Sequence, residues 1–214
     1  MARGYFITLE GGEGAGKSTQ AARLADRIAA LGRQVVRTRE PGGSPGAEAI
    51  RALLVTGAAD RWSPISETLL MYAARSDHIE RVIAPALERG DVVVCDRYAD
   101  STRAYQGAGG GAPPSLIEGL EEAVLGAARP DLTLILDLPV EAGLARTASR
   151  PSAETRFEAR DLAFHGRIRE TFRSLARAEP GRCLVIDAAA DADAVAAAIW
   201  VVIGPRLGER PRLP

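Results

Sequence analysis

The chain contains little of several residue types on which whole classes of proteins depend. Among its 214 residues are 2 cysteines and 2 histidines, and the formal net charge is −1. Cys95 and Cys183 each border an apolar run, so we expect buried free thiols in a reduced, cytoplasmic setting rather than a disulfide or a metal pair. A charge this close to neutral provides no basic field to recruit nucleic acid.

Two further absences concern membranes and covalent catalysis. No apolar run reaches the roughly 20 residues that a membrane span needs, and no N-terminal signal peptide is visible, because strand-like residues begin at Tyr5. We therefore expect neither a membrane nor a nucleic acid as a partner. His78 and His165 are isolated, which favours structural roles, and no nucleophile–base pair is apparent.

Lysine is almost absent: among 27 Lys and Arg residues, the one lysine is Lys17. It lies in a Gly-rich segment that matches the pattern G-x-x-x-x-G-K-[ST] of the phosphate-binding P-loop. A chance glycine-rich turn is the alternative, but the apolar run Tyr5–Leu9 before it and the helical pattern Ser18–Leu31 after it favour the P-loop. Loop amides and the helix N-terminus then bind phosphates. The residues predicted to bind ATP are Gly11, Gly12, Glu13, Gly14, Ala15, Gly16, Lys17, Ser18 and Thr19.

Apolar runs that read as strands alternate with helical segments along the chain. This order predicts an α/β fold, with a five-stranded parallel sheet flanked by helices on both faces, as in P-loop NTPases. The expected strands are Tyr5–Leu9, Gln34–Thr38, Val92–Cys95, Leu132–Leu136 and Cys183–Ile186. The expected helices are Ser18–Leu31, Ala47–Val55, Ser66–Arg89, Ser115–Leu125, Val140–Arg146, Asp161–Ala178 and Asp193–Ile203.

We expect residues 1–206 to form one domain and residues 207–214, which are rich in proline, to form a C-terminal tail. Three segments interrupt the alternation: Arg39–Gly43, Gln106–Pro114 and Arg146–Arg156. Ordinary surface loops are the alternative, but ligands of α/β proteins bind beyond the carboxyl ends of the strands, where these segments lie. The many Gly and Pro residues of Gln106–Pro114 predict irregular structure.

Charged residues follow the buried strand at Val92–Cys95. Asp96 ends it, and such an acid holds Mg²⁺ together with the P-loop hydroxyl of Ser18, although a helix cap or a surface ion pair is the alternative. Arg97 is suited to bind a second phosphate, and we expect Arg39 and Arg75 to converge with it, although each alone reads as a surface arginine. Three arginines around one acceptor predict transfer between two phosphorylated molecules. An ionised phosphate acceptor needs no general base.

The segment 146–158 contains Arg146, Arg150 and Arg156, and we interpret it as a short lid. A lid closes over bound substrates, and its guanidinium groups stabilise the charge of a phosphoryl group in transfer. The alternative is a loop that merely connects two helices.

Together these residues resemble the bacterial thymidylate kinases, a family of P-loop nucleoside-monophosphate kinases, over about residues 4–203. The motifs that carry the resemblance are Leu9–Thr19, Thr38–Gly43, Tyr72–Arg75, Asp96–Tyr98, Ser101–Gly107 and Arg129–Thr133. The resemblance implies transfer of the γ-phosphoryl group of ATP to dTMP, which gives dTDP and ADP for dTTP biosynthesis. It also implies Mg²⁺ as cofactor and a homodimer formed through the helix at 66–89.

Residue roles carried over from the resemblance form three groups. The catalytic residues are Lys17, Arg97, Arg150 and Glu13, and the metal ligands are Ser18 and Asp96. The dTMP-binding residues are Glu13, Arg39, Pro41, Met71, Tyr72, Arg75, Arg97, Ser101, Thr102, Tyr105 and Gln106. Asp187–Ala189 falls where the family contacts adenine.

Two departures from the family leave assignments open. Many relatives carry a phenylalanine four residues before the arginine that is Arg75 here, and this chain has Met71 there, so either Met71 or Tyr72 covers thymine. In the lid, Arg150 matches the catalytic arginine better than Arg146 or Arg156. Three other interpretations are a kinase for another monophosphate, a nucleotide switch or assembly ATPase, and an inactive scaffold. The scaffold is disfavoured because Lys17, Ser18, Asp96 and Arg97 are all present.

Overall fold

A computed structural model describes residues 3–58, 60–148, 156–157 and 160–208 of the chain. Five strands in this part form one sheet in the order β2-β3-β1-β4-β5, and every neighbouring pair is parallel. Their bounds are β1 Tyr5–Glu10, β2 Val35–Arg39, β3 Val92–Asp96, β4 Leu132–Asp137 and β5 Cys183–Asp187. Each strand begins within one residue of its predicted start, so the α/β fold class and the five-stranded parallel sheet are confirmed.

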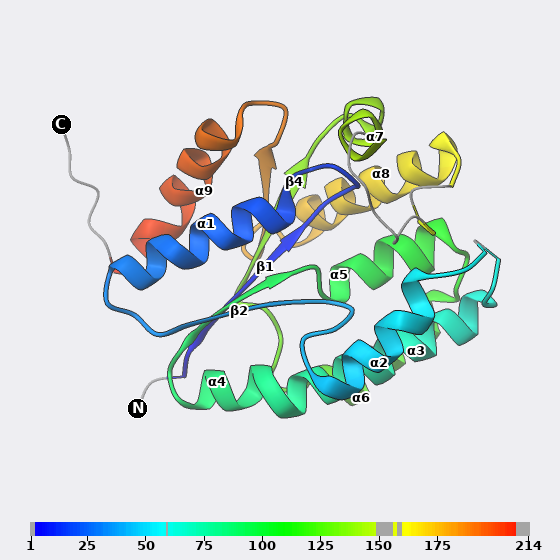
Figure 1. Cartoon of the computed structure of the whole chain (residues 1–214), viewed down its shortest axis with the longest axis horizontal. Helices are drawn as coiled ribbons and strands as arrows, with labels where there is room; N and C mark the ends of the chain where they lie inside the picture. Colours follow the sequence, from blue (N-terminus) through cyan, green and yellow to red (C-terminus); the bar gives the residue numbers. More distant parts are fainter. Residues whose placement is uncertain (1–2, 59, 149–155, 158–159, 209–214) are drawn as a thin grey trace.

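Helices cover both faces of this sheet (Figure 1). Their bounds are α1 Lys17–Ala30, α2 Pro45–Val55, α3 Pro64–His78, η1 Ile79–Ile83, α4 Ala84–Glu88, α5 Ala99–Thr102, η2 Arg103–Gly109, α6 Pro114–Leu125, α7 Val140–Ala148, α8 Leu162–Ala178 and α9 Ala192–Arg206. Among the described residues, no helix combines the length and the apolarity that crossing a membrane requires.

The alternation of side chains along the strands builds a core on each face. Leu9 and Val94 point to the side covered by α1 and α9, where Ile28 and Ile199 are buried. Phe6 and Val93 point to the opposite side, where they pack on η1 and α4. Under α8, a third cluster joins this helix to η2 and the sheet. The two free cysteines, Cys95 and Cys183, are buried in these cores, as predicted.

The long helix predicted at Ser66–Arg89 is present from Pro64 to Glu88, but it is not uniform. Its middle, η1, is a π-helical turn, and Pro85 follows at once. Proline has no N–H to donate to the preceding turn, which accounts for the irregular hydrogen bonding at this point.

The prediction that Gln106–Pro114 is irregular was wrong for its first half. The chain continues from α5 into the π-helical η2, which ends at Gly109. The glycines are needed for close packing: a Cβ at Gly109 would lie 2.7 Å from Cε2 of Phe164 in α8. Gly109 therefore allows η2 to lie against α8, and η2 contributes buried side chains to the site described below.

Candidate active site

The P-loop connects β1 to α1, and three of its glycines have conformations or neighbours that exclude a side chain. Gly11, Gly14 and Gly16 have φ angles of 138°, 68° and 86°. A Cβ at Gly11 would lie 2.4 Å from the carbonyl oxygen of Leu136, and one at Gly14 would lie 2.1 Å from that of Gly143. At these two glycines the loop packs directly against the backbone of β4 and of α7.

Lys17 begins α1 and is largely buried. Its Nζ donates a hydrogen bond to the carbonyl oxygen of Gly12, at 2.7 Å. Burial, together with the positive charge of Arg97, lowers the pKa of Lys17 to about 8. An anionic phosphate beside this ammonium would counteract both effects, so the loop is prepared to bind a phosphate group.

The end of β3 brings Asp96 to the start of α1. The Ser18 hydroxyl donates a hydrogen bond to Oδ2 of Asp96, across 78 residues of sequence. A hydroxyl and a carboxylate are both hard oxygen donors. The two residues proposed from sequence as metal ligands therefore lie side by side next to the P-loop.

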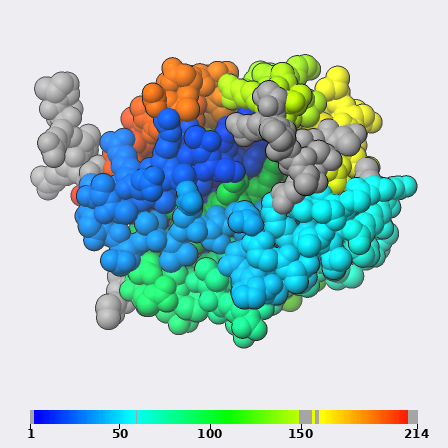
Figure 2. Space-filling view, in the orientation of Figure 1, coloured from blue at the N-terminus to red at the C-terminus, as the bar shows by residue number. Residues whose placement is uncertain are grey.

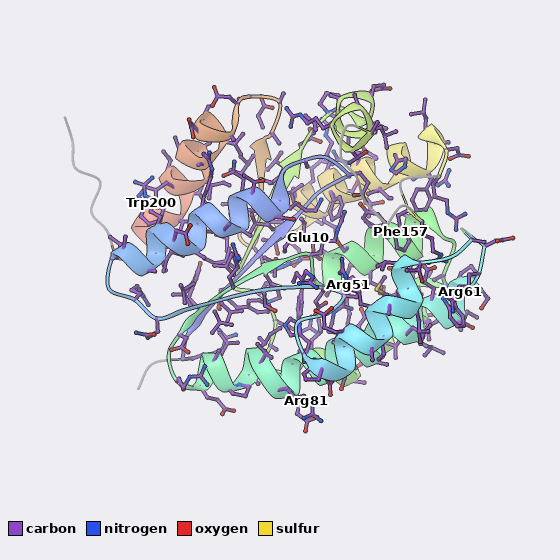
Figure 3. The ribbon with its side chains drawn as sticks, viewed as in Figure 1. Glu10, Arg51, Arg61, Arg81, Phe157 and Trp200 are labelled. Atoms are coloured by element: carbon purple, nitrogen blue, oxygen red, sulfur yellow. The ribbon has the colours of Figure 1, made fainter. Side chains whose placement is uncertain are left out.

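A pocket lies between the P-loop, α2, α3 and the α5–η2 segment, and we call it the acceptor pocket. Arg51 of α2 and Phe157, which precedes α8, reach it from different parts of the chain, and both are labelled in Figure 3 together with Glu10 at the end of β1. The residues that line it are Glu13, Glu40, Pro41, Arg51, Val55, Met71, Arg75, Arg97, Tyr98, Ser101, Thr102, Tyr105, Gln106 and Phe157. On the face shown in Figure 2, the blue residues of α1 and the cyan residues of α2 and α3 occupy different parts of the surface.

Arg97 lies where the P-loop meets the acceptor pocket. Its Nη2 donates to Oε1 of Glu13 at 2.9 Å, its Nη1 donates to the Gly11 carbonyl oxygen at 3.1 Å, and its guanidinium lies over the Tyr105 ring. Arg97 has a φ of 66°, an unusual conformation for a residue with a side chain, and one that often occurs at functional sites. The Tyr105 hydroxyl donates to the same Glu13 oxygen, at 2.8 Å.

Glu13 is a carboxylate held between two cations. Burial opposes its ionisation, but Arg97 and Lys17 outweigh burial and lower the pKa of Glu13 to about 2. Burial also weakens the charged form of Arg97, yet the surrounding acids and Tyr105 raise its pKa above the usual value. Both side chains are therefore charged at neutral pH, and they connect the donor loop to the acceptor pocket.

Arg75 forms the inner wall of the acceptor pocket and is 2% exposed. Its Nε donates to Oε2 of Glu40 at 2.8 Å, and its Nη2 donates to Oγ1 of Thr102 at 3.1 Å. Its Nη1 is buried and has no hydrogen-bond partner among the described residues. Glu40 also bonds Nδ1 of His78 at 2.9 Å, so this histidine has the structural role that the sequence predicted. The Glu40–Pro41 peptide bond is cis.

The structure brings most of the predicted dTMP-binding residues to the acceptor pocket, but not Arg39 and Tyr72. Arg39 is half exposed and pairs with Glu48 of α2 at 3.0 Å, outside the lining of the pocket. Met71 lines the pocket, whereas Tyr72, the next residue of α3, points away and packs with Ala112 and Ile117. The helical geometry of α3 thus directs Met71, and not Tyr72, to the acceptor pocket.

Of the three lid arginines, Arg150 lies outside the described residues. Arg146 of α7 donates to the carbonyl oxygens of Ala188 at 3.1 Å and Ala189 at 3.4 Å, next to the segment expected to contact adenine. Arg156 is 3% exposed and pairs with Glu67 of α3, outside the lining of the acceptor pocket. This placement agrees with the weaker assignment of Arg156 from sequence.

Several lining residues were not identified from sequence. Glu40, Arg51, Val55, Tyr98 and Phe157 all contribute to the acceptor pocket. Glu40 and Tyr98 lie inside motifs that the sequence had already indicated, so proximity to those motifs was an available signal. No signal in the sequence indicated Arg51 or Phe157, because only the packing of α2 and of the segment before α8 directs them to this pocket.

Comparison with known proteins agrees with this geometry. The family model described as thymidylate kinase matches residues 9–199. A thymidylate kinase of Caulobacter vibrioides is 67% identical over 208 residues, which are 97% of this chain and 100% of that protein. One of Nitrobacter winogradskyi is 53% identical over 95% of this chain and 90% of its own length.

A solved structure is also similar to this fold. The crystal structure of thymidylate kinase from Ehrlichia chaffeensis superposes with a TM-score of 0.76 at 34% sequence identity, and the match covers 94% of this chain and 99% of that one. The chain therefore belongs to the thymidylate kinase family.

Proposed function

We infer that this chain transfers the γ-phosphoryl group of ATP to dTMP and releases dTDP and ADP, the activity that its family membership implies. The observation that carries this inference for the site itself is the contact of Arg97 with both Glu13 and the Gly11 carbonyl. It joins a phosphate-binding loop to a second, separate pocket that contains arginines. Two phosphorylated molecules held in this way need positioning and charge neutralisation more than a general base.

On the donor side, we assign the ATP phosphates to the amides of residues 11–16, to Lys17 and to Thr19. The shape of the loop supports this, because its glycines leave the backbone accessible beside the start of α1. Lys17 supplies a compact charge whose position is constrained by its hydrogen bond to Gly12. Arg146, which bonds the segment after β5, is suited to border the adenine.

Ser18 and Asp96 are the residues that would hold Mg²⁺. Their direct hydrogen bond supports a shared oxygen site, and an ion there would take its other ligands from phosphate oxygens and water. When bound, Mg²⁺ neutralises part of the charge of the phosphates during transfer.

On the acceptor side, Arg97 would bind the phosphate of dTMP, and Arg39 would join it only after leaving Glu48. Arg75, Thr102, Gln106 and Met71 would surround the base. Tyr105 and Glu13 would border the deoxyribose, and the hydrogen bond between them leaves little space for a 2′-hydroxyl. Pro41 and Ser101 also line the pocket and would contact dTMP.

For the transition state, we propose Lys17, Arg97 and Arg150 as the groups that stabilise the transferred phosphoryl group, with Glu13 orienting Arg97. Residues 146–158 would act as the lid.

We also propose that residues 1–206 are one domain followed by a tail at 207–214, and that the protein acts in the cytoplasm without a nucleic-acid or membrane partner. Buried free cysteines support a reducing compartment.

The test is the release of ADP in a coupled assay with Mg-ATP and a panel of nucleoside monophosphates. We expect strong acceleration by dTMP, weaker acceleration by dUMP, and little by AMP, CMP or GMP. Activity with a different monophosphate would retain the mechanism and overturn the assignment of the base pocket. ATP binding without turnover on any acceptor would favour a nucleotide switch. A switch would not need the acceptor pocket.

A further inference from the structure

We propose that Glu67, held in place by Arg156, sets the hydrogen-bonding polarity of the base pocket through Gln106. The pocket would thereby accept a pyrimidine with a 4-oxo group and an N3–H, and reject one with a 4-amino group. This inference rests on the proposed function, because it assumes that the acceptor pocket receives the base of a pyrimidine nucleotide. Glu67 and Arg156 do not line the pocket, so both act as positioning residues.

Gln106 is the side chain that carries the effect. It is 2% exposed and lines the acceptor pocket from η2. Its Nε2 donates to Oε1 of Glu67 in α3, at 2.8 Å, and this contact joins two elements 39 residues apart. A carboxylate can only accept hydrogen bonds, so Gln106 must present its NH₂ to Glu67. Its carbonyl oxygen then points away from Glu67 and is available as an acceptor for a ligand.

Arg156 keeps Glu67 an acceptor. Its guanidinium pairs with Oε2 of Glu67, the oxygen that Gln106 does not use. It also donates to the carbonyl oxygens of Leu54 at 3.0 Å and Ala58 at 3.1 Å. An arginine has only donors, so Glu67 accepts from both of its neighbours, Arg156 and Gln106. The amide of Gln106 therefore has one favourable orientation rather than two.

Arg75 provides the complementary group. Its Nη1 is a buried donor without a partner among the described residues, and the side chain lines the same pocket. The pocket is thus lined by one side chain with an unused donor, Arg75, and by one with an unused acceptor, Gln106. Thymine presents the matching pair, an acceptor at O4 next to a donor at N3. Cytosine presents the reverse pair, so it would place donor against donor and acceptor against acceptor, and buried polar groups left unpaired in this way are costly.

The experiment measures kcat/KM for dTMP and for dCMP in the full chain and in Glu67→Gln. An uncharged amide at position 67 both donates and accepts, so Gln106 is free to turn its NH₂ toward the base. We expect the dTMP/dCMP ratio of kcat/KM to fall at least about 10-fold, with most of the loss for dTMP appearing in KM. Calorimetric titration with dTMP needs no turnover, and it should show a Kd that rises by the same factor as KM.

Glu121→Gln is the matched control. Glu121 of α6 is also buried, and it pairs with Arg103 of the same η2 element, but it does not line the acceptor pocket. We expect this variant to lose stability and to keep the dTMP/dCMP ratio. Equal falls for both nucleotides in Glu67→Gln, with the ratio unchanged, would overturn the proposal and leave Glu67 with only a structural role.

Gln106→Leu separates the relay from other effects of Glu67. This variant removes the acceptor from the pocket, so adding Glu67→Gln to it should change the ratio by less than about twofold. A full additional effect of Glu67→Gln in this background would contradict a role of Glu67 that acts through Gln106.

If Glu67→Gln does not fold, Glu67→Asp is the substitute variant. It retains the charge but shortens the reach to Gln106, and we expect the same fall in the dTMP/dCMP ratio. An unmodified chain that phosphorylates neither nucleotide would instead refute the proposed function.

Discussion

At the scale of single residues, the site depends on charges that are largely buried and paired. Glu13, Arg97 and Lys17 lie in one cluster, and the charge of each determines how readily the others ionise. Desolvation strengthens their mutual interactions because little water remains to screen them. A substitution here therefore changes the site's electrostatics more than its shape.

We expect Lys17→Met to lower kcat/KM for dTMP phosphorylation by at least about 10²-fold, because a preorganised charge near the phosphates would be lost. The fold should persist, since methionine fills a similar volume and no buried charge is created. ADP release and thermal unfolding are the two measurements. Turnover equal to that of the unmodified chain would remove the P-loop lysine from the mechanism.

The burial of Glu10 makes the free energy of unfolding depend on pH. It is fully buried at the end of β1, where it accepts hydrogen bonds from the Tyr98 and Ser101 amides at 2.8 Å and 3.2 Å. Burial, with the negative charge of Asp100, raises the pKa of Glu10 to about 8. The folded chain thus binds a proton between about pH 4.5 and 8 that the unfolded chain releases, and the corresponding stability is lost as the pH rises through this window.

Glu10→Gln tests this because it mimics the protonated acid. Between pH 5.5 and 7.5, the free energy of unfolding of the unmodified chain should fall relative to that of Glu10→Gln by about 2 kcal/mol. Denaturant unfolding at both pH values measures the difference between the two chains, so that groups common to both cancel. Parallel pH profiles would show that Glu10 does not titrate in this range.

At the scale of elements, the acceptor pocket depends on how closely η2 approaches α8. Gly109 permits this approach, since any Cβ there would meet the buried ring of Phe164. Gln106 and Tyr105 belong to the same element and line the pocket. The packing of one glycine therefore affects the position of two proposed substrate contacts.

We expect Gly109→Ala to lower the free energy of unfolding by about 1–3 kcal/mol, because the core around Phe164 cannot take up the extra carbon without moving. Gly119→Ala in α6 is the control: nothing lies within 4 Å of its added Cβ, and alanine favours helix, so stability should rise by about 0.5–1 kcal/mol. The denaturant midpoints of the two variants and of the unmodified chain measure these changes in stability. A stabilised Gly109→Ala would mean that η2 and α8 are less tightly packed than described.

At the scale of the whole molecule, the long helix from α3 to α4 presents apolar surface. Ile65 and Leu69 are 49% and 47% exposed and lie one helical turn apart on α3. From these exposed apolar side chains we propose the homodimer that the family resemblance implies, formed through the helix at 66–89.

Purified chain should accordingly elute near twice its mass of 22.6 kDa in size-exclusion chromatography with light scattering. Leu69→Glu should shift it toward the monomer, because a charge would be buried at the interface. Val201→Glu on α9 serves as control, since Val201 is 75% exposed and lies outside the proposed interface. A monomer at micromolar concentration without any substitution would refute the dimer.

Much of the fold and part of the site followed from local patterns in the sequence. The strands at Val92–Asp96 and Leu132–Asp137 are nearly continuous apolar runs because both of their faces are covered, and such runs are recognisable without a structure. The P-loop is equally local, since Gly14 and Gly16 need their conformation within one short turn. These features depend on residues close together in the chain, which is why the sequence by itself determined them.

Only the tertiary structure decided which distant side chains share the acceptor pocket. Arg39 was expected there and pairs with Glu48, whereas Arg51 and Phe157 were not expected and line it. The connection of Gln106 to Glu67 and Arg156 joins three elements that no spacing rule relates. Helix packing sets the direction of each of these side chains, and it depends on the whole core, so the motifs specified the chemistry while the packing specified its geometry.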